Sequence, residues 1–335
     1  MTHEEATLIR TSVRSLAVMV LAVAACLAGP AAAFAAVAAP ASPHVIATVP
    51  VGEGPSGIGV NSDTVRVYVA NFREDTISVI DQLAKTVETI AVGSGPAAVG
   101  VNGVTNRVYV ANQNGGLTVI DGLTNHVLGT IPMGGLPDGV GVNPDTNMIY
   151  VTNFLANTVT VVDGATNHVV DTIPVAATPL GIGVNSTTNR IYVACVDGDL
   201  VSVIDGSTNT VIASVGGVGS DPSSVAVNVP FNQVYVAARG SNQLFAIDGA
   251  TNQVLGHVST GTYPTGVGFV SFSGRVYVAN QLTNDVTVVR AKPFVVVGSI
   301  DVGATPTDAE ADDATGRVFV SNQDAASVSV IGPHA

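Results

Sequence analysis

A chain of 335 residues is long enough for two or three ordinary domains, although all-β barrels and propellers of this length also fold as one domain. Hydrophobic residues make up 47% of the chain and charged residues 11%, while 36 glycines and 17 prolines indicate frequent turns around a large core. This composition excludes a disordered chain. The net charge of −13 makes nucleic acid and anionic membrane surfaces unfavourable partners.

The first 39 residues have the layout of a secretory signal. Arg10 and Arg14 precede the apolar run 16–28, and an alanine-rich stretch follows it. The run is shorter than the roughly 20 apolar residues that a membrane-spanning helix needs. A buried helix is the alternative to a secretory signal. We therefore expect cleavage near residues 35–39, no transmembrane domain in the mature protein, and a secreted or cell-surface location.

The two cysteines leave a second interpretation of this segment open. Residues 23–26 read Val-Ala-Ala-Cys and resemble a lipobox, in which Cys26 would be lipidated and would anchor the protein. Ordinary cleavage would instead remove Cys26 and leave Cys195 as the single thiol of the mature chain. An intramolecular disulfide is then excluded, so the core must stabilise the fold.

Residues 40–335 are predicted to form one domain, which begins with a strand over residues 44–52. This stretch is rich in β-branched residues and reads like residues 169–175, yet it precedes the first copy of a repeat. The repeat units start near residues 55, 96, 137, 179, 222, 264 and 306.

A short phrase, Tyr-Val-Ala-Asn or a close variant, marks the seven copies of this repeat. Successive copies are 41 to 43 residues apart, a period typical of a propeller with one blade per copy. The phrase begins at Tyr68, Tyr109, Tyr150, Tyr192, Tyr235, Tyr277 and Phe319.

Each unit contains four segments that favour strands, as the third unit illustrates with residues 139–143, 148–153, 158–163 and 169–174. An Asp-Gly turn lies between the third and fourth segments, and we expect its glycine to take the positive φ that such a hairpin requires. The repeated aspartates of these turns and the asparagines that end the phrase are expected to have structural roles.

The phrase Tyr-Val-Thr-Asn at residues 150–153, the Pro-x-Gly start of the units and the Asp-Gly-x-Thr-Asn turns resemble the YVTN-type β-propeller repeat family over residues 44 to 332. The resemblance implies a seven-bladed propeller, often secreted or on the cell surface of prokaryotes, without a single shared activity. Cys195, Ala238 and Arg290 depart from the family pattern, so the loops of blades four to six are expected to differ.

The seventh unit ends after its third strand, at residues 327–331. Pairing of residues 44–52 with this strand would supply the missing fourth strand and close the ring. The predicted fold class is therefore all-β: seven four-stranded antiparallel blades, with the last blade completed by the N-terminal strand. Closure covers edges that would otherwise promote aggregation.

A ligand is expected at the channel mouth, on the face that carries the loops between the second and third strands and between blades, by analogy with other propellers. The loops there vary between copies, so the fold does not dictate their residues. An arginine fork and an aromatic face would orient a ligand. The candidates for ligand binding are Arg73, Arg239, Tyr263, Asp138 and Asp197.

Three acidic residues on one strand, Asp308, Glu310 and Asp312, are candidate metal ligands. At the first two positions the other six copies carry only small residues, and side chains two apart on a strand share a face. Carboxylates this close repel one another unless protons or a cation neutralise them. No cofactor is required, but Ca²⁺ or Mg²⁺ would suit such oxygen ligands. A solvated, irregular start of the closing blade is the alternative.

Zinc chemistry is poorly supported, because His126 and His168 fall in equivalent hairpin turns of neighbouring blades and His257 falls in an outer strand. Streptogramin lyases resemble this architecture and imply His and carboxylate ligands around a divalent metal at the channel mouth. The corresponding loops of this sequence contain no histidine.

The function most consistent with these features is an exported, non-catalytic propeller that serves as an extracellular or cell-surface binding module. We expect a monomer whose partner, a small molecule, glycan or protein, sits at the channel mouth. Two alternatives stay open: an enzyme of lyase or lactonase type with its active site there, and a structural component of a surface layer.

Overall fold

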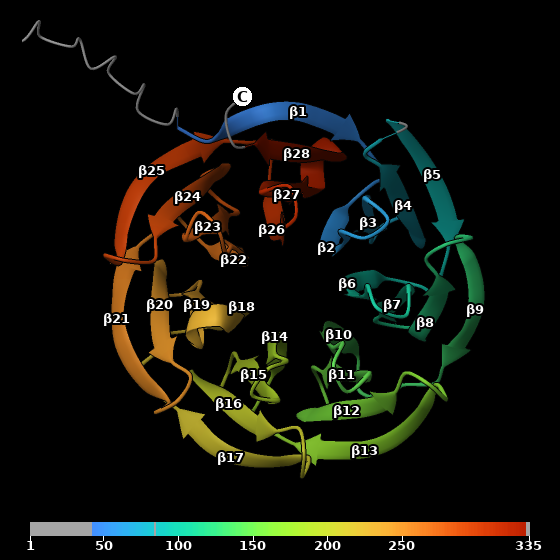
Figure 1. Ribbon diagram of the computed structural model, residues 1–335, viewed down its shortest axis with the longest axis horizontal. Coiled ribbons are helices and arrows are strands. Elements are labelled where there is room, and N and C mark those ends of the chain that lie inside the picture. The colour runs from blue at the N-terminus through green and yellow to red at the C-terminus, as the bar shows by residue number, and fades with distance from the viewer. Residues whose placement is uncertain (1–41, 84, 333–335) are drawn as a thin grey trace, which may run out of the picture. The chain divides into compact units, whose positions relative to one another are not determined.

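A computed structural model describes residues 42–83 and 85–332. The predicted signal and Cys26 lie outside this part. In the described residues no helix is long and apolar enough to cross a membrane. The described residues form a ring of seven four-stranded antiparallel sheets around a central channel (Figure 1), so the all-β, seven-bladed prediction is confirmed.

In the first six blades the strands run in chain order from the channel outward, and the last blade takes its outermost strand from residues 44–50. The innermost strands are β2 (Pro55–Asn61), β6 (Pro96–Asn102), β10 (Pro137–Asn143), β14 (Pro179–Asn185), β18 (Pro222–Asn228), β22 (Pro264–Val270) and β26 (Pro306–Asp312). The second strands, which carry the repeated phrase, are β3 (Arg66–Asn71), β7 (Arg107–Asn112), β11 (Met148–Asn153), β15 (Arg190–Cys195), β19 (Gln233–Ala238), β23 (Arg275–Asn280) and β27 (Arg317–Asn322).

The third strands are β4 (Thr76–Asp81), β8 (Gly116–Asp121), β12 (Thr158–Asp163), β16 (Leu200–Asp205), β20 (Gln243–Asp248), β24 (Asp285–Arg290) and β28 (Ser327–Gly332). The outer strands are β5 (Thr86–Ala91), β9 (His126–Ile131), β13 (His168–Pro174), β17 (Thr210–Val215), β21 (Gln253–Ser259), β25 (Val295–Asp301) and β1 (His44–Pro50). Two 3₁₀ turns, η1 (Val229–Phe231) and η2 (Gln323–Ala325), lie in connections.

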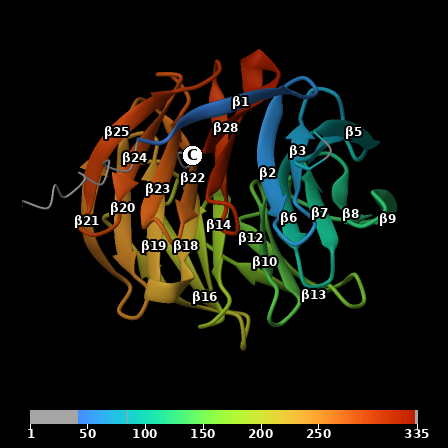
Figure 2. The same ribbon diagram turned by 45° about the horizontal axis from the view of Figure 1, so that its top comes forward.

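The ring closes as the sequence predicts. Strand β1 pairs antiparallel with β28, with Val49 opposite Val328 and Pro50 opposite Ser327, and so completes the last blade. Figure 2 shows β1 lying alongside β28 at the junction of the two ends of the propeller. Residues from both ends of the propeller therefore form one sheet.

The core lies between neighbouring blades, where the β-branched residues of the middle strands interdigitate. Tyr68 of the first blade, for example, packs with Val99 and Val110 of the second. The Tyr68 hydroxyl also donates a hydrogen bond of 3.0 Å to the carbonyl of Gly122 in that next blade. The repeated aromatic position thus holds one blade against the next.

Asparagines at the end of the inner strands join the blades on the face opposite the channel mouth. Each donates from Nδ2 to Oδ1 of an asparagine in the next blade, an amide contact that continues from the first blade to the fifth. The pairs are Asn61 with Asn106 at 3.1 Å, Asn102 with Asn147 at 2.8 Å, Asn143 with Asn189 at 2.7 Å, and Asn185 with Asn232 at 2.8 Å.

The Asp-Gly turns differ from the prediction in one respect. Asp121 Oδ1 accepts backbone hydrogen bonds from Leu123 and Thr124, as a turn residue should, but the positive φ belongs to Asn125, at 58°, and not to Gly122. Asparagine tolerates this conformation. The glycine is needed for space instead, since a Cβ there would lie 3.2 Å from the Tyr68 hydroxyl oxygen.

Candidate functional site

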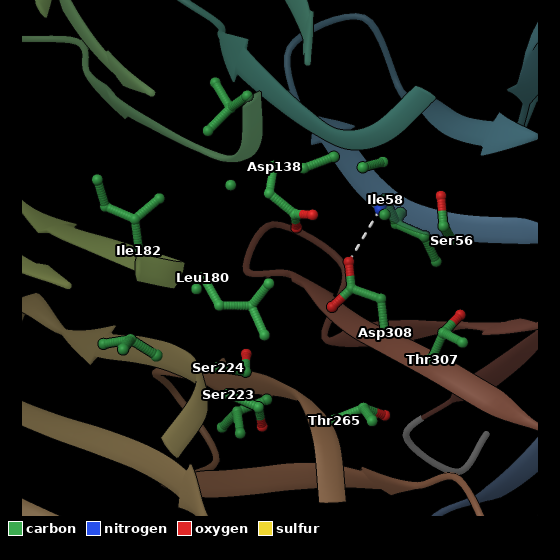
Figure 3. A pocket seen from close by; sticks show the side chains of 18 of the residues that line it. Ser56, Ile58, Asp138, Leu180, Ile182, Ser223, Ser224, Thr265, Thr307 and Asp308 are labelled. Atoms are coloured by element: carbon green, nitrogen blue, oxygen red, sulfur yellow. Dashed lines mark hydrogen bonds between the residues drawn. The ribbon is translucent and has the colours of Figure 1, made fainter. Parts of the chain in front are cut away.

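A cavity of about 290 Å³ opens at the channel mouth, at the start of the inner strands. The residue after each leading proline points into it, one from every blade. Figure 3 shows several of these side chains around the opening. This mouth ring consists of Ser56, Ala97, Asp138, Leu180, Ser223, Thr265 and Thr307.

The hydroxyls of the mouth ring hold neighbouring blades together. Each donates to the carbonyl of the next blade's leading proline, so it is engaged in the scaffold. The contacts are Ser56 to Pro96 at 3.0 Å, Ser223 to Pro264 at 3.0 Å, Thr265 to Pro306 at 3.2 Å, and Thr307 to Pro55 at 3.1 Å. Asp138 is the one ionisable member of the ring.

Asp138 is held between a neutral donor and a cation. Gln113 Nε2 donates to its Oδ2 at 2.8 Å. Burial raises the pKa of this carboxyl, while the Gln113 hydrogen bond and the charge of Arg239 act to lower it. Arg239 lines the same cavity and stacks on the ring of Tyr263, with 5.5 Å from its guanidinium carbon to the ring centroid. Its buried Nε has no hydrogen-bond partner among the described residues.

Asp308 and Glu310 bring two further carboxyls to the channel from β26. Small residues at these positions in other blades are required by packing: a Cβ on Gly139 would lie 2.3 Å from the Leu180 carbonyl, and one on Gly181 would lie 2.4 Å from the Ser223 carbonyl. At the seam between the last and first blades, Asp308 instead reaches across, and its Oδ2 accepts from the backbone N–H of Ile58 at 2.9 Å (Figure 3).

Both of these carboxyls hold protons unusually tightly. Burial raises the pKa of Asp308 to about 6, although the backbone N–H groups of Ile58 and Ala309 act to lower it. Burial and then the charges of Asp308 and Asp313 raise the pKa of Glu310 to about 8. Glu310 also lines a second cavity of about 380 Å³ that lies toward the opposite face, so it stands where the two halves of the channel meet.

The third acidic candidate does not join them. Asp312 is buried, and its oxygens accept from Ser62 Oγ at 2.8 Å and Thr315 Oγ1 at 2.7 Å. In the part of the chain that the structure describes, no group of three or more His, Cys, Asp or Glu could hold a metal ion. A metal site that uses all three carboxylates is therefore not formed. Binding of Ca²⁺ or Mg²⁺ by this acidic strand stays a prediction.

The five candidates for ligand binding separate into two groups. Asp138 and Arg239 line the cavity, and Tyr263 supports Arg239. Arg73 instead forms an ion pair of 3.0 Å with Asp324, and both side chains are 51% exposed. Asp197 accepts from Thr178 Oγ1 at 2.5 Å on the exposed surface. Neither Arg73 nor Asp197 lines the cavity.

Sequence reasoning missed Gln113, which orients Asp138, and most of the mouth ring. Both sets have a simple signal. The ring follows the leading prolines, while Gln113 and Arg239 directly follow the second-strand phrase in their blades. Equivalent positions of a repeat lie at equivalent heights in the ring. Aligning the seven copies at these two positions therefore shows which blades carry a charged residue there.

Comparison with known proteins agrees with this architecture. Residues 61–190 match the family described as YNCE-like beta-propeller. No curated protein matches the sequence. Among solved structures, Kuenenia stuttgartiensis hydrazine synthase is similar with a TM-score of 0.75 and 17% identity, over 85% of this chain and 96% of that one.

A chain of the mitotic checkpoint complex is similar with a TM-score of 0.78 and 12% identity, over 87% of this chain and 92% of that one. Identities this low show the fold alone. The family match and the closed ring of seven blades together fit a YVTN-type repeat propeller.

Proposed function

We propose that this protein is an exported propeller that binds a small polar molecule in the mouth of its central channel. The observation that carries the proposal is the cavity at the mouth, where ionisable side chains from three different blades meet: Asp138, Arg239, Asp308 and Glu310. Export is supported by the layout of residues 1–39, with its basic start and apolar run.

The arrangement suits binding, because its polar groups are oriented before a ligand arrives. Gln113 fixes the Asp138 carboxyl, Tyr263 supports the Arg239 guanidinium, and two backbone N–H groups fix Asp308. Preorganised groups in a concave cavity lose little conformational entropy when a ligand binds. The cavity is small, which favours a compact molecule over an extended polymer.

The test compares two arginines. A metabolite library is screened by thermal shift, and each hit is measured by calorimetry on wild type, Arg239→Ala and Arg73→Ala. We expect Arg239→Ala to change the affinity at least tenfold, because it removes the positive charge from the cavity wall, and Arg73→Ala to leave the affinity within a factor of two. Equal affinity in all three proteins, or no hit, would contradict a ligand at the mouth.

The same assay distinguishes binding from catalysis, since a hit that is converted to product over time would make the protein an enzyme. Export is tested separately, by N-terminal sequencing of the mature protein from the organism's extracellular and envelope fractions. An intact N-terminus in the cytoplasm would contradict it. Lipid attachment that is lost in Cys26→Ser would select anchoring.

Exposed apolar residues on the outer strands favour a second candidate, a structural role through self-assembly. Neighbouring pairs occur on several of these strands, such as Val127 with Leu128 and Val169 with Val170. Exposed outer edges that carry apolar side chains are surfaces on which chains can pair. Light scattering at rising protein concentration tests this role: ordered assembly supports it, and a stable monomer contradicts it.

A further inference from the structure

The negative charge of the channel is balanced on one side only. Burial raises the pKa of Asp138, and the positive charge of Arg239 acts against this effect. On the opposite wall, no described cationic side chain lowers the pKa of Asp308 or Glu310, and Asp313 adds a further negative charge next to Glu310. The channel therefore contains a site where a positive group from outside would meet no competing charge from the protein.

Glu310 also differs from its neighbours in its contacts. Both oxygens of Asp308 accept backbone hydrogen bonds, from Ile58 at 2.9 Å and Ala309 at 2.8 Å. The carboxyl of Glu310 makes no hydrogen bond with any described residue, although the side chain lines both cavities. A half-buried carboxyl without a partner is unfavourable for folding, and six other blades avoid it with Gly or Ala at this position. A carboxyl that lines a cavity without a partner indicates a contact with a ligand.

We propose that the channel ligand is a small organic cation, whose ammonium group is bound between the carboxylates of Asp308 and Glu310. This inference rests on the proposed function and names the chemical class of its ligand. Residues two apart on a strand lie roughly 6.5 to 7 Å apart along it and share a face. That spacing accommodates one ammonium nitrogen with a charge-assisted hydrogen bond of about 2.8 Å to each carboxylate.

An ammonium suits this pair better than a metal ion does. Ca²⁺ requires about six to eight oxygen ligands and Mg²⁺ about six, whereas an ammonium is satisfied by about three acceptors. The described residues provide no group of three metal-ligating side chains. The cavity of about 290 Å³ above the pair has space for a short carbon chain attached to the ammonium.

Three probes with the same four-carbon chain test the charge requirement: n-butylammonium, butanoate and butan-1-ol. Binding is followed by the NMR shifts of the Ile58 and Ala309 amides, because both donate to Asp308. We expect n-butylammonium to shift both amides in wild type, and butanoate and butan-1-ol to leave them unchanged. Glu310→Gln should weaken n-butylammonium binding at least tenfold, the loss of one charge-assisted hydrogen bond.

Asp171→Asn is the matched control, since it removes one negative charge from the exposed outer strand β13. Its affinity for n-butylammonium should equal that of wild type. Retained binding in Glu310→Gln, or equal weakening in both variants, would overturn the inference. So would CaCl₂ that shifts the same two amides at lower concentration than n-butylammonium.

The probes also separate this inference from the proposed function. If butanoate or butan-1-ol binds at the mouth and n-butylammonium does not, the cation assignment is wrong while the mouth remains a binding site. If none of the three binds, the cation assignment is also wrong. The library screen with Arg239→Ala then decides independently whether the mouth binds any ligand.

Discussion

Asp308 accepts a hydrogen bond from the backbone N–H of Ile58 at 2.9 Å and so joins residues 250 positions apart in the chain. The contact lies at the seam where the last blade meets the first. Asp312 repeats the pattern farther along the same strand, where it accepts from Ser62 Oγ at 2.8 Å. The pairing of β1 with β28 brings the two ends of the propeller together at this junction. The two carboxylates add contacts between the last blade and the first.

The seam contact predicts a stability loss in Asp308→Ala. The substitution leaves the Ile58 N–H without its acceptor, which should cost about 1 to 3 kcal/mol in the free energy of unfolding. Asp308→Asn, which keeps an acceptor oxygen, should lose less. Urea unfolding at pH 7 measures both. Asp171→Ala, on the exposed outer strand, should stay within about 0.5 kcal/mol of wild type; an equal loss in that control would remove the special role of the seam.

Closure by β1 predicts aggregation of a chain that lacks residues 44–52. Deletion exposes the edge of β28, whose backbone groups and apolar side chains then lie open to other chains. Light scattering should show oligomers, and the melting temperature should fall. A synthetic peptide of residues 44–52 should restore the monomer, while a scrambled peptide should not. A truncated protein that stays monomeric with unchanged melting would contradict this closure.

Glu310 predicts that stability falls as the pH rises. The pKa of Glu310 is about 8 in the folded protein, whereas the reference value for an exposed glutamate is 4.5. The folded state therefore binds the proton more tightly than the unfolded state does. Stability from this group is fully present below pH 4.5 and is lost as the pH rises toward 8, by an amount on the order of a few kcal/mol at most.

Glu310→Gln removes this titration. The variant should therefore melt at a higher temperature than wild type at pH 8, and the difference should shrink at pH 5. Scanning calorimetry at several pH values measures it. A difference that is constant with pH would show that Glu310 does not titrate in this range.

Two equivalent tyrosines predict opposite effects of losing a hydroxyl. Tyr68 donates to the Gly122 carbonyl at 3.0 Å, whereas the buried hydroxyl of Tyr150 has no partner among the described residues. Tyr68→Phe should lose about 0.5 to 1.5 kcal/mol of stability, and Tyr150→Phe should be neutral or stabilising. Urea unfolding of the two variants measures both effects, and each variant is the control for the other. Equal losses of stability would contradict the prediction.

The sequence by itself determined the architecture, because a propeller blade is specified locally. Each copy carries its own β-branched strands and turn residues, so the period of 41 to 43 residues and the count of phrases predict seven blades. The missing fourth strand of the last copy and the surplus strand at residues 44–52 predict the closure that β1 and β28 make.

Only the tertiary structure decided which loop residues share the channel. Arg73 and Arg239 both follow the repeated phrase, yet Arg73 pairs with Asp324 on the surface and Arg239 lines the cavity. Asp308, Glu310 and Asp312 share a strand, yet Asp312 is buried against Ser62 while Glu310 opens into the channel. These outcomes depend on contacts between blades, and repeat periodicity carries no information about how far each side chain reaches across a seam.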